Sequence, residues 1–279
     1  MVFMSWILHR KVLINILLAA FFAAFGIFVN GQTGPGGVGN FDGSNNQPRN
    51  VLWLDASSLS LTDGVSVETW SDISGNAYDA SNTTTAEQPE FVQSSALINN
   101  KSLIRFYGLD AADNDHLDLP SELGTTQDGV VGNNYTFFVV AGRRAAGENW
   151  ILGGNPGGPA NGNLGIGWRS NNNFAQVHWG NDIDVGTGAQ LTATGQLGIF
   201  TADFNVSKSP SARKVFENSQ LQNTRNNNTA LGQWNTPTLG MFAGGRWADV
   251  DIAEVIFFNE AVSDAQRIII ENYLGAKYG

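Results

Sequence analysis

The chain has 279 residues and a net charge of −10, and only 14% of its residues are charged, against roughly 25% in ordinary soluble domains. So few charges exclude a helical bundle or coiled coil, the acidic balance disfavours nucleic-acid binding, and an apolar content of 42% excludes a disordered chain. There is no Cys, which removes disulfides, thiolate metal sites and cysteine nucleophiles.

The N-terminal segment has the pattern of an export signal. His9, Arg10 and Lys11 precede the apolar residues 12–29, and the segment closes on small residues at Gly31. A positive start, an apolar middle and a small-residue end predict a secretory signal peptide over residues 1–31. The alternative is a retained signal anchor, because an apolar segment of this length is just long enough to span a bilayer. Cleavage after Gly31 predicts a secreted or cell-surface protein.

The rest of the chain has the sequence pattern of a β protein. Residues 32–50 are rich in Gly, Asn and Pro, which predicts a linker. Short runs rich in Val, Ile, Phe and Trp follow, separated by Gly/Asn clusters, and several alternate between polar and apolar residues as half-buried antiparallel strands do. The runs fall at 51–55, 65–70, 102–107, 135–141, 149–152, 164–169, 174–179, 197–204, 213–217, 238–243 and 249–259. Strands with no helix between them predict a sandwich or a barrel.

One helix is expected, over residues 263–279. Ser263 and Gln266 form a capping-box pattern at its start. Its apolar stripe begins at Ile268 or Ile269 and recurs at helical spacing. We expect this helix to cover one end or edge of the sandwich.

Several motifs follow one another in order along residues 51–279. They are VLWLDA (51–56), VETWSDISGN (67–76), RFYGLD (105–110), LGIGWRSNN (164–172), DIAEVIFFN (251–259) and ENYLGAKYG (271–279). Together they resemble LamG-like domains of the concanavalin A-like lectin/glucanase superfamily. The resemblance implies an all-β jelly-roll sandwich of two antiparallel sheets with one C-terminal helix, of the kind found in surface proteins of Bacteroidetes-type bacteria. This fold hosts lectins, enzymes, adhesion modules and spacers, so it implies little about activity.

The sharpest catalytic pattern is Asp249-x-Asp251-x-x-Glu254. Glucanases of the superfamily carry Glu-x-Asp-x-x-Glu on one strand, where the outer carboxylates act as nucleophile and acid. Here the first residue is Asp, the motif lies on the last long strand, and all three carboxylates share a face only if a bulge intervenes. The alternative is a structural role, in which Glu254 caps a backbone group or meets a base. We expect the structural role and no catalysis.

Asp110, Asp113 and Asp115 belong to the densest acidic cluster of the chain. Carboxylate oxygens gathered in a loop suit Ca²⁺, and LamG-like domains often hold Ca²⁺ at a loop edge. The spacing is not that of an EF-hand, so the alternative is a solvated acidic turn.

Aromatic and amide side chains suit sugar binding, because rings stack on the C–H faces of sugars and polar groups bond the hydroxyls. In the run 174–179, alternation puts Gln176 and His178 on one face, and we expect that face to be exposed. Trp234 and Trp247, beside Gly/Asn loops, are the expected stacking residues. The candidate ligand-binding residues are Arg169, Gln176, His178, Asp182, Trp234 and Trp247.

Together these patterns predict an exported, non-catalytic LamG-like module that binds a glycan or another surface partner. The first alternative is a passive structural or adhesion domain of a larger surface protein. The second is a glycoside hydrolase that uses Asp249, Asp251 and Glu254.

Overall fold

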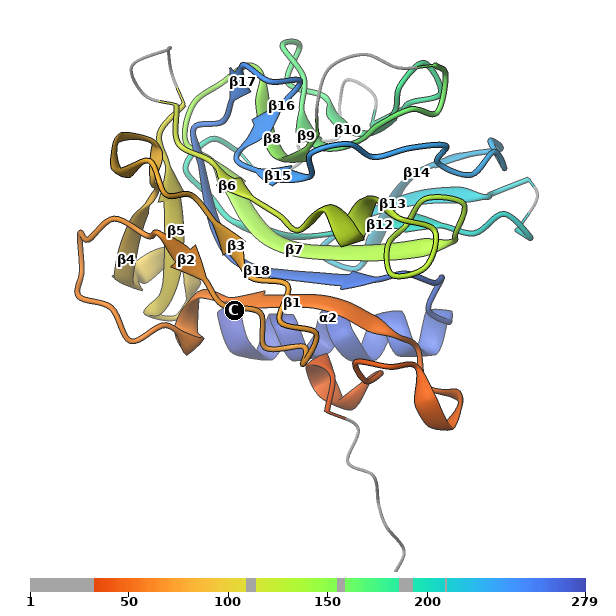
Figure 1. The fold of residues 1–279 in the computed structure, drawn as a ribbon, viewed down its shortest axis with the longest axis horizontal. Coiled ribbons are helices and arrows are strands. Elements are labelled where there is room, and N and C mark those ends of the chain that lie inside the picture. Colours follow the sequence, from red (N-terminus) through yellow and green to blue (C-terminus); the bar gives the residue numbers. More distant parts are fainter. Residues whose placement is uncertain (1–32, 109–113, 155–158, 186–192, 209) are drawn as a thin grey trace, which may run out of the picture. The chain divides into compact units, whose positions relative to one another are not determined.

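Two antiparallel β-sheets face each other across an apolar core (Figure 1). The computed structural model describes residues 33–108, 114–154, 159–185, 193–208 and 210–279. The expected all-β sandwich with one C-terminal helix is confirmed.

The first sheet has the strand order β14-β13-β12-β7-β18-β5-β4, and β1 also pairs with β18. Its strands are β1 (Asn50–Asp55), β4 (Glu90–Ser95), β5 (Lys101–Phe106), β7 (Tyr135–Arg143), β12 (Gly198–Phe204), β13 (Arg213–Glu217), β14 (Gln220–Arg225) and β18 (Val250–Phe258).

The second sheet has the order β11-β10-β9-β8-β15-β6-β3-β2, and a small hairpin pairs β16 with β17. These strands are β2 (Thr69–Trp70), β3 (Ala80–Ser81), β6 (Leu117–Asp118), β8 (Asn149–Gly153), β9 (Leu164–Trp168), β10 (Phe174–His178), β11 (Ile183–Asp184), β15 (Thr238–Leu239), β16 (Met241–Phe242) and β17 (Arg246–Trp247).

Strands β7 and β18 are buried on both faces, which explains why they read as nearly continuous apolar runs. On β7, Phe137 and Val139 face the inter-sheet core, whereas Phe138 and Val140 face the opposite side. The opposite side is covered by α2 (Asp264–Tyr278), so the fold has three layers in this region (Figure 1).

Helix α2 begins as predicted but buries a different face. The Ser263 hydroxyl accepts from the backbone of Gln266 in a complete capping box. The buried stripe is Ile270, Leu274 and Tyr278, while Ile268 and Ile269 are 46% and 47% exposed. The expected stripe is therefore wrong by one or two residues, and the helix covers a sheet face rather than an end of the sandwich. No helix in the described part of the chain is both long and apolar enough to cross a membrane.

Residues 33–50 are packed on the fold and are not the linker that their composition suggested. Asn40 bridges Arg49, and the Asn50 amide donates to the Asn40 carbonyl at 2.7 Å. Val38 is buried in the same cluster as α2. A few contacts therefore hold a segment whose composition predicts none.

A β-bulge interrupts β18 between Ile252 and Glu254. Before it, β18 pairs with β5; after it, β18 pairs with β1. Ile252 and Val255 both face the inter-sheet core, so the bulge turns Glu254 to the α2 side. The bulge thus controls where the carboxylates of this strand point.

Candidate functional site

A polar cavity lies where β4 forms the edge of the first sheet. The segment 64–67 runs beside β4: the Val67 amide donates to the Pro89 carbonyl at 2.7 Å, and the Phe91 amide donates to the Val65 carbonyl at 2.9 Å. Val67 and Phe91 are buried in the core. Because side chains alternate along extended chain, Ser66 and Glu90 are left on the cavity side.

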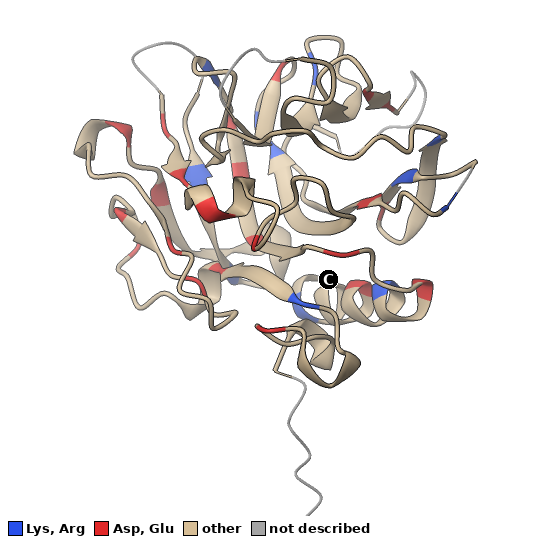
Figure 2. Ribbon diagram, turned by 45° about the vertical axis from the view of Figure 1, so that its right-hand side comes forward, with Lys and Arg blue, Asp and Glu red and all other residues tan. Residues whose placement is uncertain are grey.

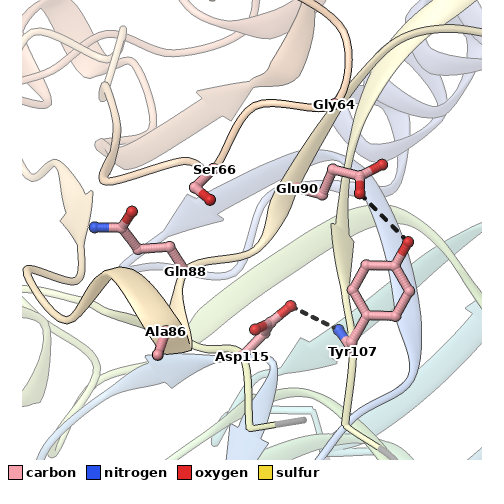
Figure 3. Close-up of a pocket in the computed structure, with 7 residues that line it drawn as sticks. All are labelled: Gly64, Ser66, Ala86, Gln88, Glu90, Tyr107 and Asp115. Carbon is pink, nitrogen blue, oxygen red and sulfur yellow. Dashed lines mark hydrogen bonds between the residues drawn. The ribbon is translucent and has the colours of Figure 1, made fainter.

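The cavity has a volume of about 340 Å³. Figure 3 shows the side chains of Ser66, Gln88 and Asp115 around it, with Glu90 and Tyr107 side by side. Asp115 is only 7% exposed, and its Oδ2 accepts from the Tyr107 amide at 2.9 Å. Tyr107 OH lies 3.5 Å from Glu90 Oε2. Gly64 and Ala86 complete the lining.

Two arginines lie near Tyr107, and one of them, Arg105, is the cross-strand partner of Glu90. The Arg144 guanidinium stacks on the Tyr107 ring at 4.5 Å from its centroid and is paired to Asp249 at 2.9 Å. Arg105 donates twice to Asp251, at 2.8 and 3.0 Å. This bidentate bond to Asp251 holds the pKa of Arg105 above its ordinary value. Asp249 and Asp251 therefore neutralise and position the arginines beside the cavity.

Glu254 occupies a separate, closed position under α2. Its carboxylate is fully buried and accepts from the Trp53 indole at 2.7 Å, Tyr278 OH at 2.7 Å and Lys277 Nζ at 2.7 Å. Burial raises the pKa of Glu254, and Lys277 opposes that shift. The bulge that catalysis would need is present, but it brings Glu254 to a helix rather than to a cleft.

The acidic triplet is therefore divided between two structural tasks. Asp249 and Asp251 bind arginines, and Glu254 binds Lys277 and two tyrosines, the second being Tyr273 at 3.0 Å. The structure matches the structural interpretation, in which Glu254 meets a base. These three carboxylates do not form an accessible pair that could flank a substrate bond.

The expected exposure of Gln176 and His178 is wrong, since both side chains are fully buried. They point between the sheets, where the Gln176 amide donates to Tyr135 OH at 2.6 Å and Tyr135 OH contacts His178 Nε2 at 2.7 Å. Alternation along β10 was predicted correctly, but the apolar partners Ala175 and Val177 lie on the other face, under the β16–β17 hairpin. Both faces of β10 are covered by other parts of the fold. The polarity of its residues therefore did not show which face points away from the inter-sheet core.

Arg169 and Asp182 are brought together, but to bind each other. Arg169 pairs with Asp182 at 2.5 Å and with Asp184 at 2.7 Å. Asp182 also accepts from the His178 amide at 3.1 Å. These contacts tie the ends of β9, β10 and β11 together.

The two expected stacking tryptophans differ in burial. Trp234 is 2% exposed, stacks on Phe257 at 5.9 Å and donates to the Gly153 carbonyl at 3.0 Å, so its expected role as a surface platform is wrong. Trp247 is half-buried on β17 and stays a candidate for a sugar contact. The hairpin that carries it closes over Gly165, where a Cβ would lie 2.8 Å from the Phe242 ring.

Of the expected calcium ligands, Asp110 and Asp113 lie outside the described residues. Asp115 lines the cavity. Within the described ranges no three His, Asp or Glu side chains are grouped as a metal site. Calcium binding at this loop stays a prediction.

The sequence reasoning missed most of the cavity. Gln88 and Glu90 lie between the predicted runs 65–70 and 102–107, so the strand β4 that carries Glu90 was not predicted. Ser66 lies in the predicted run 65–70 but was not considered as a binding residue. Its signal was the strand-forming pair Phe91 and Val92, which follows Pro89 and is flanked by polar residues. Tyr107 lies in the motif RFYGLD (105–110) and in the predicted strand 102–107, but it was not considered as a binding residue.

No family model matches the sequence, and a search of the curated proteins gave no significant match. Solved structures share the fold. Domain 4 of AbnA, a GH43 extracellular arabinanase from Geobacillus stearothermophilus solved with arabinotriose, is 14% identical, with a TM-score of 0.55 over 81% of this chain and 98% of that domain. The binding domain of Paraclostridial Mosquitocidal Protein 1 is 13% identical, with a TM-score of 0.52 over 80% of this chain and 51% of that one.

Trypanosoma rangeli sialidase is 13% identical, with a TM-score of 0.52 over 81% of this chain and 32% of the enzyme. The chain thus spans about a third of the sialidase and about half of the mosquitocidal binding domain. At these identities the likeness defines the fold alone. That fold is a jelly-roll β-sandwich.

Proposed function

We propose that this chain is a non-catalytic carbohydrate-binding module and that the cavity around Tyr107 is its binding site. The observation that carries the proposal is the convergence of side-chain oxygens from Ser66, Gln88, Glu90 and Asp115 beside an aromatic ring. Sugar-binding sites need this combination, because hydroxyls require hydrogen-bond partners and C–H groups require apolar contact. The volume of about 340 Å³ is at the lower end of ligand sites and suits one sugar unit of a longer chain.

Two of the similar structures support this proposal. One is an arabinanase domain solved with arabinotriose, and this chain matches nearly the whole length of that domain. The other is named as the binding domain of a toxin. The burial of Glu254 under α2 supports a binding role rather than hydrolysis, because an acid catalyst must reach its substrate.

A glycan array tests the proposal. We expect the unmodified chain to bind at least one neutral or charged oligosaccharide, and the double variant Glu90→Ala, Gln88→Ala to lose that binding by tenfold or more. Glu68→Ala is the matched control, because Glu68 is an exposed acid nearby that does not line the cavity. Repeating the array with EDTA tests whether Ca²⁺ takes part. If the double variant binds as the parent does, the site lies elsewhere; if nothing binds, the chain is a structural or adhesion domain.

We also propose that the module is exported and acts outside the cell, which rests on the N-terminal pattern of residues 1–31. The expected result is a mature protein that begins at Gln32. Intact-mass measurement of protein recovered from the medium or cell surface checks it. Retention of Met1 in the mature protein would instead indicate a signal anchor.

A further inference from the structure

We infer that Lys277 and Asp55 join through an amide bond between their side chains, with Glu254 moving the protons. The two residues are 222 positions apart in the sequence, and they meet where β1 and α2 lie side by side (Figure 1). Figure 2 shows how few basic residues the fold carries, and Lys277 contacts two carboxylates at once. The bond does not depend on sugar binding, because none of these residues lines the Tyr107 cavity.

The groups that would react are already in contact. Lys277 Nζ lies 2.6 Å from Asp55 Oδ2 and 2.7 Å from Glu254 Oε2. Asp55 and Glu254 are opposite one another in the β1–β18 pair, so the register fixes the two carboxyls and α2 brings the amine to them. Well-oriented groups held in this way react with effective molarities of about 10⁵–10⁸ M. Such proximity allows an amine and a carboxyl to condense without prior activation.

The surroundings favour the uncharged forms that the reaction needs. The side chains of Lys277 and Asp55 are only 16% and 13% exposed, and that of Glu254 is fully buried. An amine attacks a carboxyl only when both are neutral, and removal from water disfavours the charged forms. Burial also raises the pKa of Glu254, so this carboxyl accepts a proton from the ammonium more readily than an exposed acid would.

The second carboxyl distinguishes this site from a simple ion pair. An ion pair with Lys277 needs one carboxylate, and Asp55 already supplies it. Glu254 adds a fully buried acid that touches the same Nζ atom. A positioned acid of this kind is what transfer of a proton between amine and carboxyl requires.

The condensation balances without an oxidant or an activating group. Glu254 takes a proton from Nζ and passes it to Asp55 Oδ2, which leaves a neutral amine and a neutral carboxyl. The Nζ lone pair attacks Cγ, and the charge that develops on Oδ1 is stabilised by the Ser57 amide at 2.9 Å and Tyr278 OH at 3.4 Å. A second Nζ proton passes through Glu254 to Oδ2, the Cγ–Oδ2 bond breaks, and one water leaves. Glu254 ends as the carboxylate that it was at the start.

Tryptic digestion of the folded full chain, followed by mass spectrometry, tests the inference. Trypsin cleaves after Arg49, Lys101 and Arg267, and it would cleave after an unmodified Lys277 but not after an acylated one. We expect one branched peptide in which residues 50–101 are joined to residues 268–279. Its mass should be lower than the sum of its two parts by the mass of one water.

Three variants identify the groups that take part, and circular dichroism checks that each is folded. Lys277→Arg keeps the positive charge but removes the nucleophilic amine, so the branched peptide should be absent. Lys214→Arg is the matched control, because it is the same exchange on β13, and it should retain the branched peptide. Glu254→Gln should slow formation of the bond by about tenfold or more, since it removes the acid that carries the protons.

Two results would overturn the inference. Separate peptides 50–101 and 268–277 from the folded parent chain would show that Lys277 forms only ion pairs. A branched peptide that forms as fast in Glu254→Gln as in the parent would refute proton transfer by Glu254. Neither result bears on the proposed function, which the glycan array tests separately.

Discussion

Replacing Glu254 with alanine should lower the free energy of unfolding by about 3–5 kcal/mol, the cost of removing one partner from a buried ion pair. The carboxylate is fully buried and accepts from the Trp53 indole, Tyr278 OH and Lys277 Nζ. Without it these donors stay buried with fewer acceptors, and each unsatisfied group costs about 1–3 kcal/mol. The free energy of unfolding of a whole domain is only about 5–15 kcal/mol. The loss expected from this one side chain is therefore a large part of the total.

Denaturant unfolding monitored by circular dichroism measures this loss. Glu68→Ala is again the control, since Glu68 is exposed on a loop and surface substitutions usually change stability by less than about 0.5 kcal/mol. Glu254→Gln should fall between the two, because it keeps acceptor oxygen but loses the charge facing Lys277. An alanine variant as stable as the parent would show that α2 is held without this network.

Acidification should destabilise the protein through His178. Gln176 Nε2 donates to Tyr135 OH, so Tyr135 has its one hydrogen to donate to His178 Nε2 and the imidazole is neutral. Burial, and secondly the charge of Arg213, holds the pKa of His178 well below 6.5. Since the folded pKa is depressed, the unfolded chain binds more protons once the pH falls below about 6.5, and stability is lost with a slope of up to about 1.4 kcal/mol per pH unit.

The test is the free energy of unfolding at several pH values for the parent and for His178→Gln. Two other groups act in the opposite direction: burial raises the pKa of Asp203 to about 6 and raises that of Glu254, so both favour the folded state as the pH falls. Because both are present in the two proteins, the difference between the slopes isolates His178. We expect a shallower loss below pH 6.5 in the variant, and equal slopes would show that His178 titrates normally.

The pattern of apolar and alternating runs predicted the fold better than it predicted the binding site. Runs such as 135–141 and 249–259 became β7 and β18, since a strand buried on both faces must be apolar along its whole length. The sequence of residues 252–255 did not predict the bulge at Ala253. No glycine or other residue typical of bulges marks the change of register there. That single irregularity decides which carboxylate meets α2.

The expected site residues failed for a related physical reason. Polar residues on an alternating strand were assumed to face water, but Gln176 and His178 are both hydrogen-bonded to the Tyr135 hydroxyl inside the sandwich. Buried polar groups are tolerated when they find hydrogen-bond partners, and local sequence does not reveal partners that lie 40 residues away. The cavity around Tyr107 likewise joins segments 64–66 and 86–90 to Tyr107 and Asp115, which only the tertiary fold brings together.

The superfamily-like acidic triplet therefore has a different use in this chain. Asp249 and Asp251 hold the arginines that border the cavity, and Glu254 binds Lys277 of α2. One strand thus supports both the outer layer and the wall of the proposed binding site.

A crystal structure of the chain with a bound trisaccharide tests the central claim most directly. The account predicts a sugar unit seated against Tyr107, with hydroxyl groups within hydrogen-bond distance of Glu90 and Asp115 and with α2 unmoved. A trisaccharide bound instead on the second sheet beside Trp247, or a ligand in contact with Glu254 after displacement of α2, would contradict it.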